Sequence, residues 1–193
     1  CKYCDHVKGT SKAPIPEIEL SVPTYYYGVF KPYVYIPSEG AVIDTYQWQG
    51  RKIGETEWVD KTNSRLAKGY EYRLKITLMS IPGSEFELKY PWPPVTINGR
   101  ECTPHYVVSS NTFAVDLPEP LYALNFNSNG GSGSMSNLLA ADGQFILPEC
   151  TYTKDDDSFV GWRVDGKLYG VGEQVNVYGA TTAYAVWESE KIV

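Results

Sequence analysis

The sequence predicts an all-β protein, and three observations lead to that prediction. Apolar and polar side chains alternate at period two along most of the chain after residue 13, which is the spacing of a strand with one buried face. The 193 residues include 16 Tyr against 6 Phe, and tyrosine suits sheets that are packed on one face and wet on the other. No long stretch shows a convincing 3.6-residue period. A chain of this length is sufficient for two small domains, and we expect two.

The clearest strand runs from Tyr70 to Leu78, in the sequence YEYRLKITL. Its apolar side chains share one face of the strand, and Glu71, Arg73, Lys75 and Thr77 share the other. A charged face must meet water, so this pattern favours an antiparallel sheet with one face buried.

Shorter segments of the first domain repeat the same alternation, at residues 17–22, 45–48, 85–90, 95–97 and 113–117. Asn98-Gly99 predicts a tight hairpin, because both central positions of that turn require positive φ. Pro118 and Pro120 end the last strand. We therefore expect a tail or linker over residues 1–13 and a β-sandwich of about seven short strands over residues 14–119.

Several features of this stretch are shared with a known domain class: Tyr46-Gln-Trp48, the segment LAKGYEY over residues 66–72, Phe86, and the turn VTING over residues 95–99. On these residues the first domain resembles the Ig-like or fibronectin-like sandwich found between repeats in surface proteins of Gram-positive gut bacteria. The resemblance implies an Ig-like β-sandwich.

The second domain, residues 120–193, begins with a strand in which Tyr122, Leu124 and Phe126 alternate with smaller or polar residues. The stretch NGGSGS over residues 129–134 has the composition of a flexible linker. We expect a structured turn there instead, because a strand leads directly into it and Met135 follows. A second turn is expected at Asp165-Gly166.

Thirteen positions of this domain match one repeat pattern: Phe126, Gly130, Gly131, Met135, Leu147, Pro148, Phe159, Gly161, Trp162, Gly166, Tyr169, Ala185 and Trp187. The domain resembles a Listeria–Bacteroides repeat, also called the internalin B-repeat. That resemblance implies a small β-grasp-like fold, all-β or α+β, in exported bacterial proteins that often carry the repeat as tandem stalk units. We take Phe126, Phe159, Trp162 and Trp187 as its structural core. Cys150 and the single copy depart from the pattern.

The four cysteines, Cys1, Cys4, Cys102 and Cys150, are candidates for disulfides in an exported protein, and four cysteines allow three full pairings. Cys1 and Cys4 with His6 could form half of a zinc site, but the second close pair of ligands is missing, so we predict no metal. A lipid-bearing bacterial Cys1 is a further alternative.

The net charge of −6 argues against a nucleic-acid partner, since binding of phosphates needs clustered Lys and Arg. No apolar run is long enough to span a membrane. No signal peptide is visible, although the chain starts at Cys1 without Met, which suggests a processed or cut end. The resemblance places the protein outside the cell or on its surface.

Residues that could carry catalysis are few, and we predict no enzyme, no catalytic residue and no cofactor. Neither His6 nor His105 has a nucleophile or an acid at a sequence spacing that indicates a catalytic arrangement. The sequence also contains no nucleophile elbow. The acidic run Asp155–Asp157 lacks the spaced pattern of a calcium loop and favours a solvated hairpin tip.

Two aromatic clusters are candidate ligand-binding residues: Tyr25, Tyr26 and Tyr27, and Trp92 within YPWPP. Aromatic rings exposed in loops stack on sugars or anchor protein partners. The alternative for Trp92 is a cap on the sandwich core.

Together these observations predict a non-catalytic part of an exported bacterial surface protein, acting in adhesion or as a stalk. Its expected partners are a host protein or glycan and the neighbouring modules of its parent chain. The alternative is a carbohydrate-binding module of a larger secreted enzyme.

Overall fold

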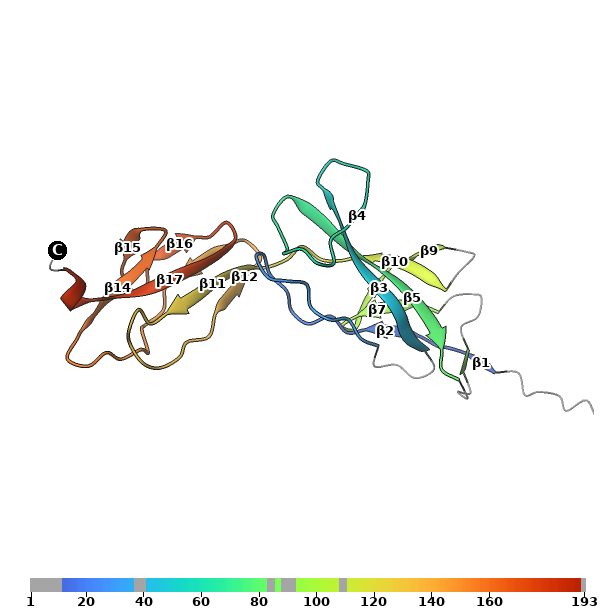
Figure 1. Ribbon diagram of the computed structural model, residues 1–193, viewed down its shortest axis with the longest axis horizontal. Helices are drawn as coiled ribbons and strands as arrows, with labels where there is room; N and C mark the ends of the chain where they lie inside the picture. Colours follow the sequence, from blue (N-terminus) through green and yellow to red (C-terminus); the bar gives the residue numbers. More distant parts are fainter. Residues whose placement is uncertain (1–11, 37–40, 83–85, 88–92, 108–110, 192–193) are drawn as a thin grey trace, which may run out of the picture. The chain divides into compact units, whose positions relative to one another are not determined.

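The computed structural model describes residues 12–36, 41–82, 86–87, 93–107 and 111–191, and the regular secondary structure in these ranges is almost wholly β-strand (Figure 1). The one helical element in these ranges is a 3-10 turn, η1, at Glu188–Lys191. The predicted all-β fold class is confirmed. Within the same ranges, no helix has both the length and the apolar character needed to cross a membrane.

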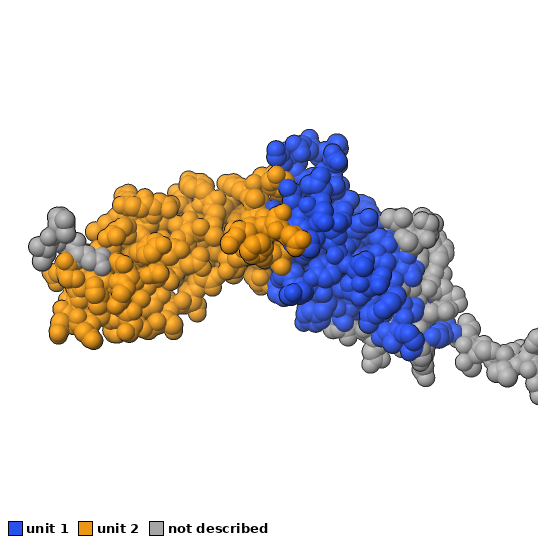
Figure 2. Space-filling view, viewed as in Figure 1, with its two compact units in different colours: residues 1–23, 32–62, 71–117 blue, residues 24–31, 63–70, 118–193 orange. Residues whose placement is uncertain are grey.

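The contacts divide the chain into two compact units, coloured blue and orange in Figure 2. Unit 1 comprises Cys1–Pro23, Pro32–Thr62 and Glu71–Leu117, and unit 2 comprises Thr24–Lys31, Asn63–Tyr70 and Pro118–Val193. The main junction lies close to the predicted boundary between residues 119 and 120. The two short segments were expected in the first domain, and they pack with the second because of long-range contacts that strand periodicity does not report.

The described residues of unit 1 form three sheets. The largest has the order β4-β3-β5-β10-β9, a second has the order β2-β7-β8, and β1 pairs with β6. The strands are β1 Ala13–Pro14, β2 Ile18–Leu20, β3 Ala41–Lys52, β4 Val59–Asp60, β5 Tyr70–Ser80, β6 Phe86–Glu87, β7 Val95–Ile97, β8 Arg100–Cys102, β9 His105–Val107 and β10 Thr112–Asp116. The pairs β4–β3, β5–β10 and β10–β9 are antiparallel, whereas β2–β7 and β1–β6 are parallel.

The clearest predicted strand is β5, and its alternation matches its burial. Tyr72, Leu74, Ile76 and Leu78 are buried, and the side chains between them are exposed or half-buried. The predicted hairpin joins β7 to β8, with φ of 50° at Asn98 and 76° at Gly99. The strand prediction rests on the period-two alternation of side chains, and the hairpin prediction rests on the need for positive φ at Asn98 and Gly99. Both are local rules, and long-range contacts leave both elements as the local sequence predicts.

Unit 2 is built around a five-stranded sheet of order β12-β11-β17-β14-β15, with β13 and β16 forming a separate two-stranded sheet. Its strands are β11 Tyr122–Asn127, β12 Leu138–Ala140, β13 Gln144–Ile146, β14 Phe159–Val164, β15 Lys167–Tyr169, β16 Gln174–Asn176 and β17 Ala180–Trp187. The first strand β11 and the last strand β17 are parallel neighbours, and the pairs β11–β12, β13–β16, β14–β15 and β14–β17 are antiparallel. No α-helix occurs in the described part of this unit.

The core of unit 2 is organised by two tryptophans that the sequence analysis selected. Trp162 and Trp187 are 0% and 1% exposed, and the ring of Phe159 contacts both. Phe126 also packs on Trp162, with ring centroids 4.9 Å apart. All four predicted core residues therefore lie in or against the core of this unit.

Each buried indole N–H has a backbone acceptor. Trp162 Nε1 donates to the carbonyl of Pro148 over 2.9 Å, and Trp187 Nε1 donates to the carbonyl of Ser128 over 2.9 Å. A buried indole N–H left without an acceptor costs about 1–3 kcal/mol. The Leu-Pro segment and the turn after β11 are thus tied directly to the two tryptophans.

The glycine-rich stretch after β11 is an ordered turn, as expected, and not a linker. Asn129 and Gly130 have φ of 49° and 88°, and the Gly131 N–H donates to the carbonyl of Ser128. Ser132 then exchanges two backbone hydrogen bonds with Thr153. A Cβ at Gly131 would lie 2.8 Å from the Thr153 oxygen and 2.8 Å from Cζ2 of Trp187, so this position has room for glycine only.

We predict that Gly131→Ala destabilises unit 2 by about 1–3 kcal/mol, because its methyl group overpacks the site beside Trp187. Urea denaturation followed through the indole N–H signals of Trp162 and Trp187 measures this change. Gly179→Ala is the matched control, because a Cβ there meets nothing within 4 Å. Equal denaturation midpoints for the two variants would contradict the account of Gly131.

Candidate functional site

The three tyrosines predicted as a ligand platform are mostly occupied within unit 2. Tyr27 is 2% exposed, its ring lies 4.9 Å from that of Tyr122, and its hydroxyl donates to Glu119 Oε1 over 2.7 Å. The Tyr25 hydroxyl donates to the carbonyl of Pro118 over 2.7 Å, and burial raises the pKa of this phenol. Tyr26 is half-buried and forms a β-bridge with Leu121.

These contacts give the tyrosine run a structural role in the packing of residues 24–31 against the start of β11. Tyr27 is closed to a ligand, which corrects the expectation for that residue. The strongly exposed aromatic residues that follow this run in the sequence are Phe30, Tyr33 and Tyr35, at 61%, 84% and 56%. Trp92 lies outside the described residues.

Trp58 is an aromatic surface residue that the sequence reasoning missed. It directly precedes β4, whose Val59 and Asp60 face Gly50 and Gln49 of β3. The guanidinium carbons of Arg51 and Arg73 lie 4.6 and 4.3 Å from its ring centroid, within cation–π range. The signal in the sequence was a single aromatic residue in the mostly polar segment ETEWVD.

Both arginines around Trp58 are held by further polar contacts. Arg51 Nε pairs with Glu71 Oε2 at 2.5 Å, and Arg73 Nε donates to Gln49 Oε1 over 2.8 Å. Each arginine therefore contacts both the Trp58 ring and a second polar side chain of the same sheet. We interpret the Trp58 cluster as packing on the surface of the five-stranded sheet and not as a ligand site.

A polar cavity lies along β17 in unit 2, with a volume of about 590 Å³. It is lined by Asn129, Arg163, Asp165, Gly166, Ala180, Thr181, Thr182 and Tyr184. Tyr184 is 44% exposed and faces Arg163 across the β14–β17 ladder. An aromatic ring beside amide, hydroxyl, guanidinium and carboxylate groups can stack on a sugar ring and hydrogen-bond its hydroxyls. None of these lining residues was predicted as a site residue, because their convergence depends on strand register.

Two of the four cysteines predicted as disulfide partners lie in the described residues. Cys102 and Cys150 are free thiols, each half-buried, with Sγ directed at the carbonyls of Val95 and Tyr152 respectively. Burial raises the pKa of both thiols, which disfavours the reactive thiolate. Cys1, Cys4 and His6 lie outside the described residues.

The other candidate chemical groups have surface roles. His105 Nε2 lies 3.7 Å from Asp116 Oδ2, and both side chains are largely exposed. Among the described residues, no cluster of three or more His, Cys, Asp or Glu side chains is arranged to hold a metal ion. The acidic run at residues 155–157 is a turn, with φ of 54° at Asp156.

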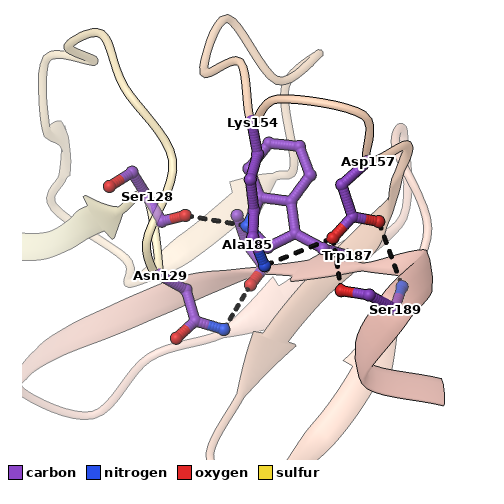
Figure 3. A network of polar contacts seen from close by, with 7 residues as sticks. All are labelled: Ser128, Asn129, Lys154, Asp157, Ala185, Trp187 and Ser189. Atoms are coloured by element: carbon purple, nitrogen blue, oxygen red, sulfur yellow. Dashed lines mark hydrogen bonds and ion pairs between the residues drawn. The ribbon is translucent and has the colours of Figure 1, made fainter. Parts of the chain in front are cut away.

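Asp157 from this turn is the centre of a polar network at one end of unit 2 (Figure 3). Lys154 Nζ lies 3.2 Å from Asp157 Oδ2, and the Ser189 N–H donates to Asp157 Oδ1 over 3.0 Å. The Ser189 hydroxyl donates a second hydrogen bond to Asp157 Oδ2. Lys154 also lies over the ring of Trp187. The network therefore joins the 154–157 turn to the residues that follow β17.

The Asp157 carboxylate is stabilised in its charged form by this arrangement. Hydrogen bonds from Ser189, with a further contribution from Lys154, lower the pKa of Asp157 from 3.8 to about 2. The lowered pKa means that protonating Asp157 favours the unfolded chain, in which the carboxyl group has its ordinary pKa. We call Lys154, Asp157 and Ser189 the end latch.

Comparisons with protein-family models, with curated proteins and with solved structures each found no match to this chain.

The end latch predicts a specific pH dependence. Its contribution to the stability of unit 2 is present above about pH 4 and is lost as the pH falls towards about 2, through the lowered pKa of Asp157. Asp157→Asn should therefore destabilise unit 2 at pH 6, and the difference from the unsubstituted protein should shrink by pH 2. Urea denaturation at the two pH values measures this difference.

Asp155→Asn is the matched control, since Asp155 is an exposed acid of the same turn outside the latch. Its difference from the unsubstituted protein should be small at both pH values. A stability loss in Asp157→Asn that stays constant between pH 6 and pH 2 would refute the role of the carboxylate charge.

Proposed function

We propose that this chain is a non-catalytic part of an exported bacterial surface protein, and that unit 2 acts in it as a spacer module of a stalk. The observation that carries the proposal is the parallel pairing of β11 with β17. Because β11 and β17 run in the same direction side by side, the Pro118–Val193 stretch of the unit begins at one end of this strand pair and finishes at the other. A module of this kind adds its own length to a stalk.

The length that one module adds follows from its longest strand. Strand β17 has eight residues, which at about 3.3 Å per residue span roughly 26 Å. An antiparallel pair of first and last strands would bring the two chain ends together and add almost nothing. Modules joined through opposite ends can extend a chain in proportion to their number, which is what a stalk requires.

The residues that carry the resemblance to a Listeria–Bacteroides repeat support this assignment. Gly131 admits the indole of Trp187, and Pro148 accepts the hydrogen bond of Trp162. A Cβ at Gly161 would lie 2.5 Å from the carbonyl oxygen of Tyr169 on the neighbouring strand β15. Each of these three matched positions thus has a packing reason to be kept in a repeated module, and none of the three reasons involves a ligand.

The finer fold assignments belong to the same proposal. For unit 2 we propose a β-grasp-like module without a helix, supported by the parallel central strands and the antiparallel strands that flank them. For unit 1 we propose an Ig-like β-sandwich, supported by its five-stranded and three-stranded sheets. Both sheets contribute fully buried residues, such as Leu74 and Leu20.

A second function has one observation in its favour. The cavity beside Tyr184 offers a half-exposed aromatic ring together with Arg163 and Asp165, which is the chemistry of a sugar site. On this alternative the chain is a carbohydrate-binding module of a larger secreted enzyme. The cavity, and not the Tyr25–Tyr27 run, is then the place where a glycan binds.

A binding screen distinguishes the two functions. The folded chain is tested against a glycan array, mucins and extracellular-matrix proteins, with heat-denatured protein as the control. The spacer proposal predicts no saturable binding. A saturable glycan signal that is lost on denaturation would overturn it in favour of sugar binding.

The position of any such signal can be tested with two tyrosine variants. Tyr184→Ala removes the aromatic ring of the cavity and should abolish a glycan signal that arises there. Tyr178→Ala is the matched control, because Tyr178 is 73% exposed in the same unit and does not line the cavity.

A further inference from the structure

The parallel pairing of β11 and β17 has a mechanical consequence when tension is applied through the two ends of unit 2. The pull on the start of β11 and the pull on the end of β17 point in opposite directions along neighbouring strands. The register joins five residue pairs, from Ala123↔Ala180 to Asn127↔Tyr184. Sliding one strand along the other strains every hydrogen bond of this ladder at once, since the bonds run between the strands.

Side-chain hydrogen bonds add to the same ladder. Asn125 Nδ2 donates to the carbonyl of Thr181 over 3.3 Å, and Asn129 Nδ2 donates to the carbonyl of Ala185 over 2.9 Å. The bond from Trp187 Nε1 to the Ser128 carbonyl joins the same two segments, and Figure 3 shows it beside the bond from Asn129. All three contacts oppose the same sliding movement.

Core packing also resists displacement of β17. Its inward side chains Ala183, Ala185 and Trp187 are at most 1% exposed, and on its other edge β17 pairs with β14. A slip of one residue would turn this buried face towards solvent, because side chains alternate along a strand. A slip of two residues would move the Trp187 indole out of the space that Gly131 leaves for it.

The end latch holds the chain at the point where tension would otherwise begin to peel β17 away. Ser189 follows β17 directly, and its N–H and hydroxyl are both bonded to Asp157. The Glu188 N–H donates to the carbonyl of Ser158 over 2.9 Å, next to the same turn. A pull on the C-terminal end therefore loads the latch before it reaches the ladder.

From these contacts we propose that unit 2 is a load-bearing module. Its resistance to tension comes from the β11–β17 ladder, which tension loads in shear along its whole length. The end latch adds to this resistance by holding the C-terminal end of β17 in place. This load-bearing role extends the proposed spacer function. It depends on the spacer function for one point, namely that a stalk is what applies tension to the unit. A stalk that holds an attached cell against flow would apply force along this axis. The resistance itself is a property of the fold and can be measured without any ligand.

Single-molecule force spectroscopy on the whole chain tests the proposal by comparing two pulling directions. In the first, handles are attached at the N- and C-termini, so that tension shears β11 against β17. In the second, handles are attached at residue 155, through Asp155→Cys, and at the C-terminus. Residue 155 lies in the turn that carries Lys154 and Asp157 of the end latch, and the C-terminus follows Ser189 of the latch, so the second direction opens the latch and peels β17 from one end. In both proteins the four native cysteines are replaced by serine.

The unfolding event of unit 2 in the first direction is identified by its release of roughly 220 Å of chain, from about 70 residues at 3.3–3.6 Å each less the folded length. We expect its peak force to exceed that of the peeling direction by about twofold or more at the same loading rate, since forced unfolding reports the barrier along the pulled coordinate. Equal forces, or a weaker event in the first direction, would overturn the proposal.

Denaturation by urea must give the same midpoint for both handle variants, so that the forces compare direction and not stability. The force measurement and the binding screen can succeed or fail independently of each other. A weak module that binds nothing would remain a spacer without a load-bearing role, and a strong module that binds a glycan would be load-bearing without being a mere spacer.

Discussion

The parallel pairing of β11 with β17 is the constraint on which unit 2 depends. Two strands separated by more than 50 residues of chain can pair in parallel only if the intervening chain crosses over and returns. The crossover supplies β12 to β16 and brings the Leu147-Pro148 segment under Trp162. It also sets the chain ends at opposite ends of the unit, so the fold, the core and the proposed spacer role share one cause.

Trp162 and Trp187 fix the position of the crossover segments against the sheet. Each places a large ring in the core and each uses its N–H to fix a segment without regular structure, at Pro148 and at Ser128. Such residues contribute packing and positioning together, and replacing a buried Trp with Ala typically costs about 3–5 kcal/mol. A unit of this size has a small core, so two such anchors carry a large share of its stability.

Local sequence rules predicted what depends on nearest neighbours. The alternation of β5, the hairpin at Asn98-Gly99 and the ordered turn at Asn129-Gly130 all follow from side-chain period and positive-φ chemistry. The four core residues of unit 2 came from the repeat resemblance. Long-range pairing could not be predicted in this way. Tyr27 was predicted as a candidate ligand-binding residue, yet it is buried against Tyr122, which lies almost a hundred positions away. The cavity beside Tyr184 and the Arg51–Trp58 contact likewise depend on register between strands.

The central claim is that β11 and β17 run parallel in the stated register, and nuclear Overhauser spectroscopy on the isotope-labelled chain tests it most directly. The account predicts cross-strand backbone contacts that join Ala123 to Ala180 and Asn127 to Tyr184, in step along both strands. Contacts that instead join Ala123 to Tyr184 and Asn127 to Ala180 would mean an antiparallel pair. Both chain ends would then lie at one end of the unit, and the spacer and load-bearing roles would fall together.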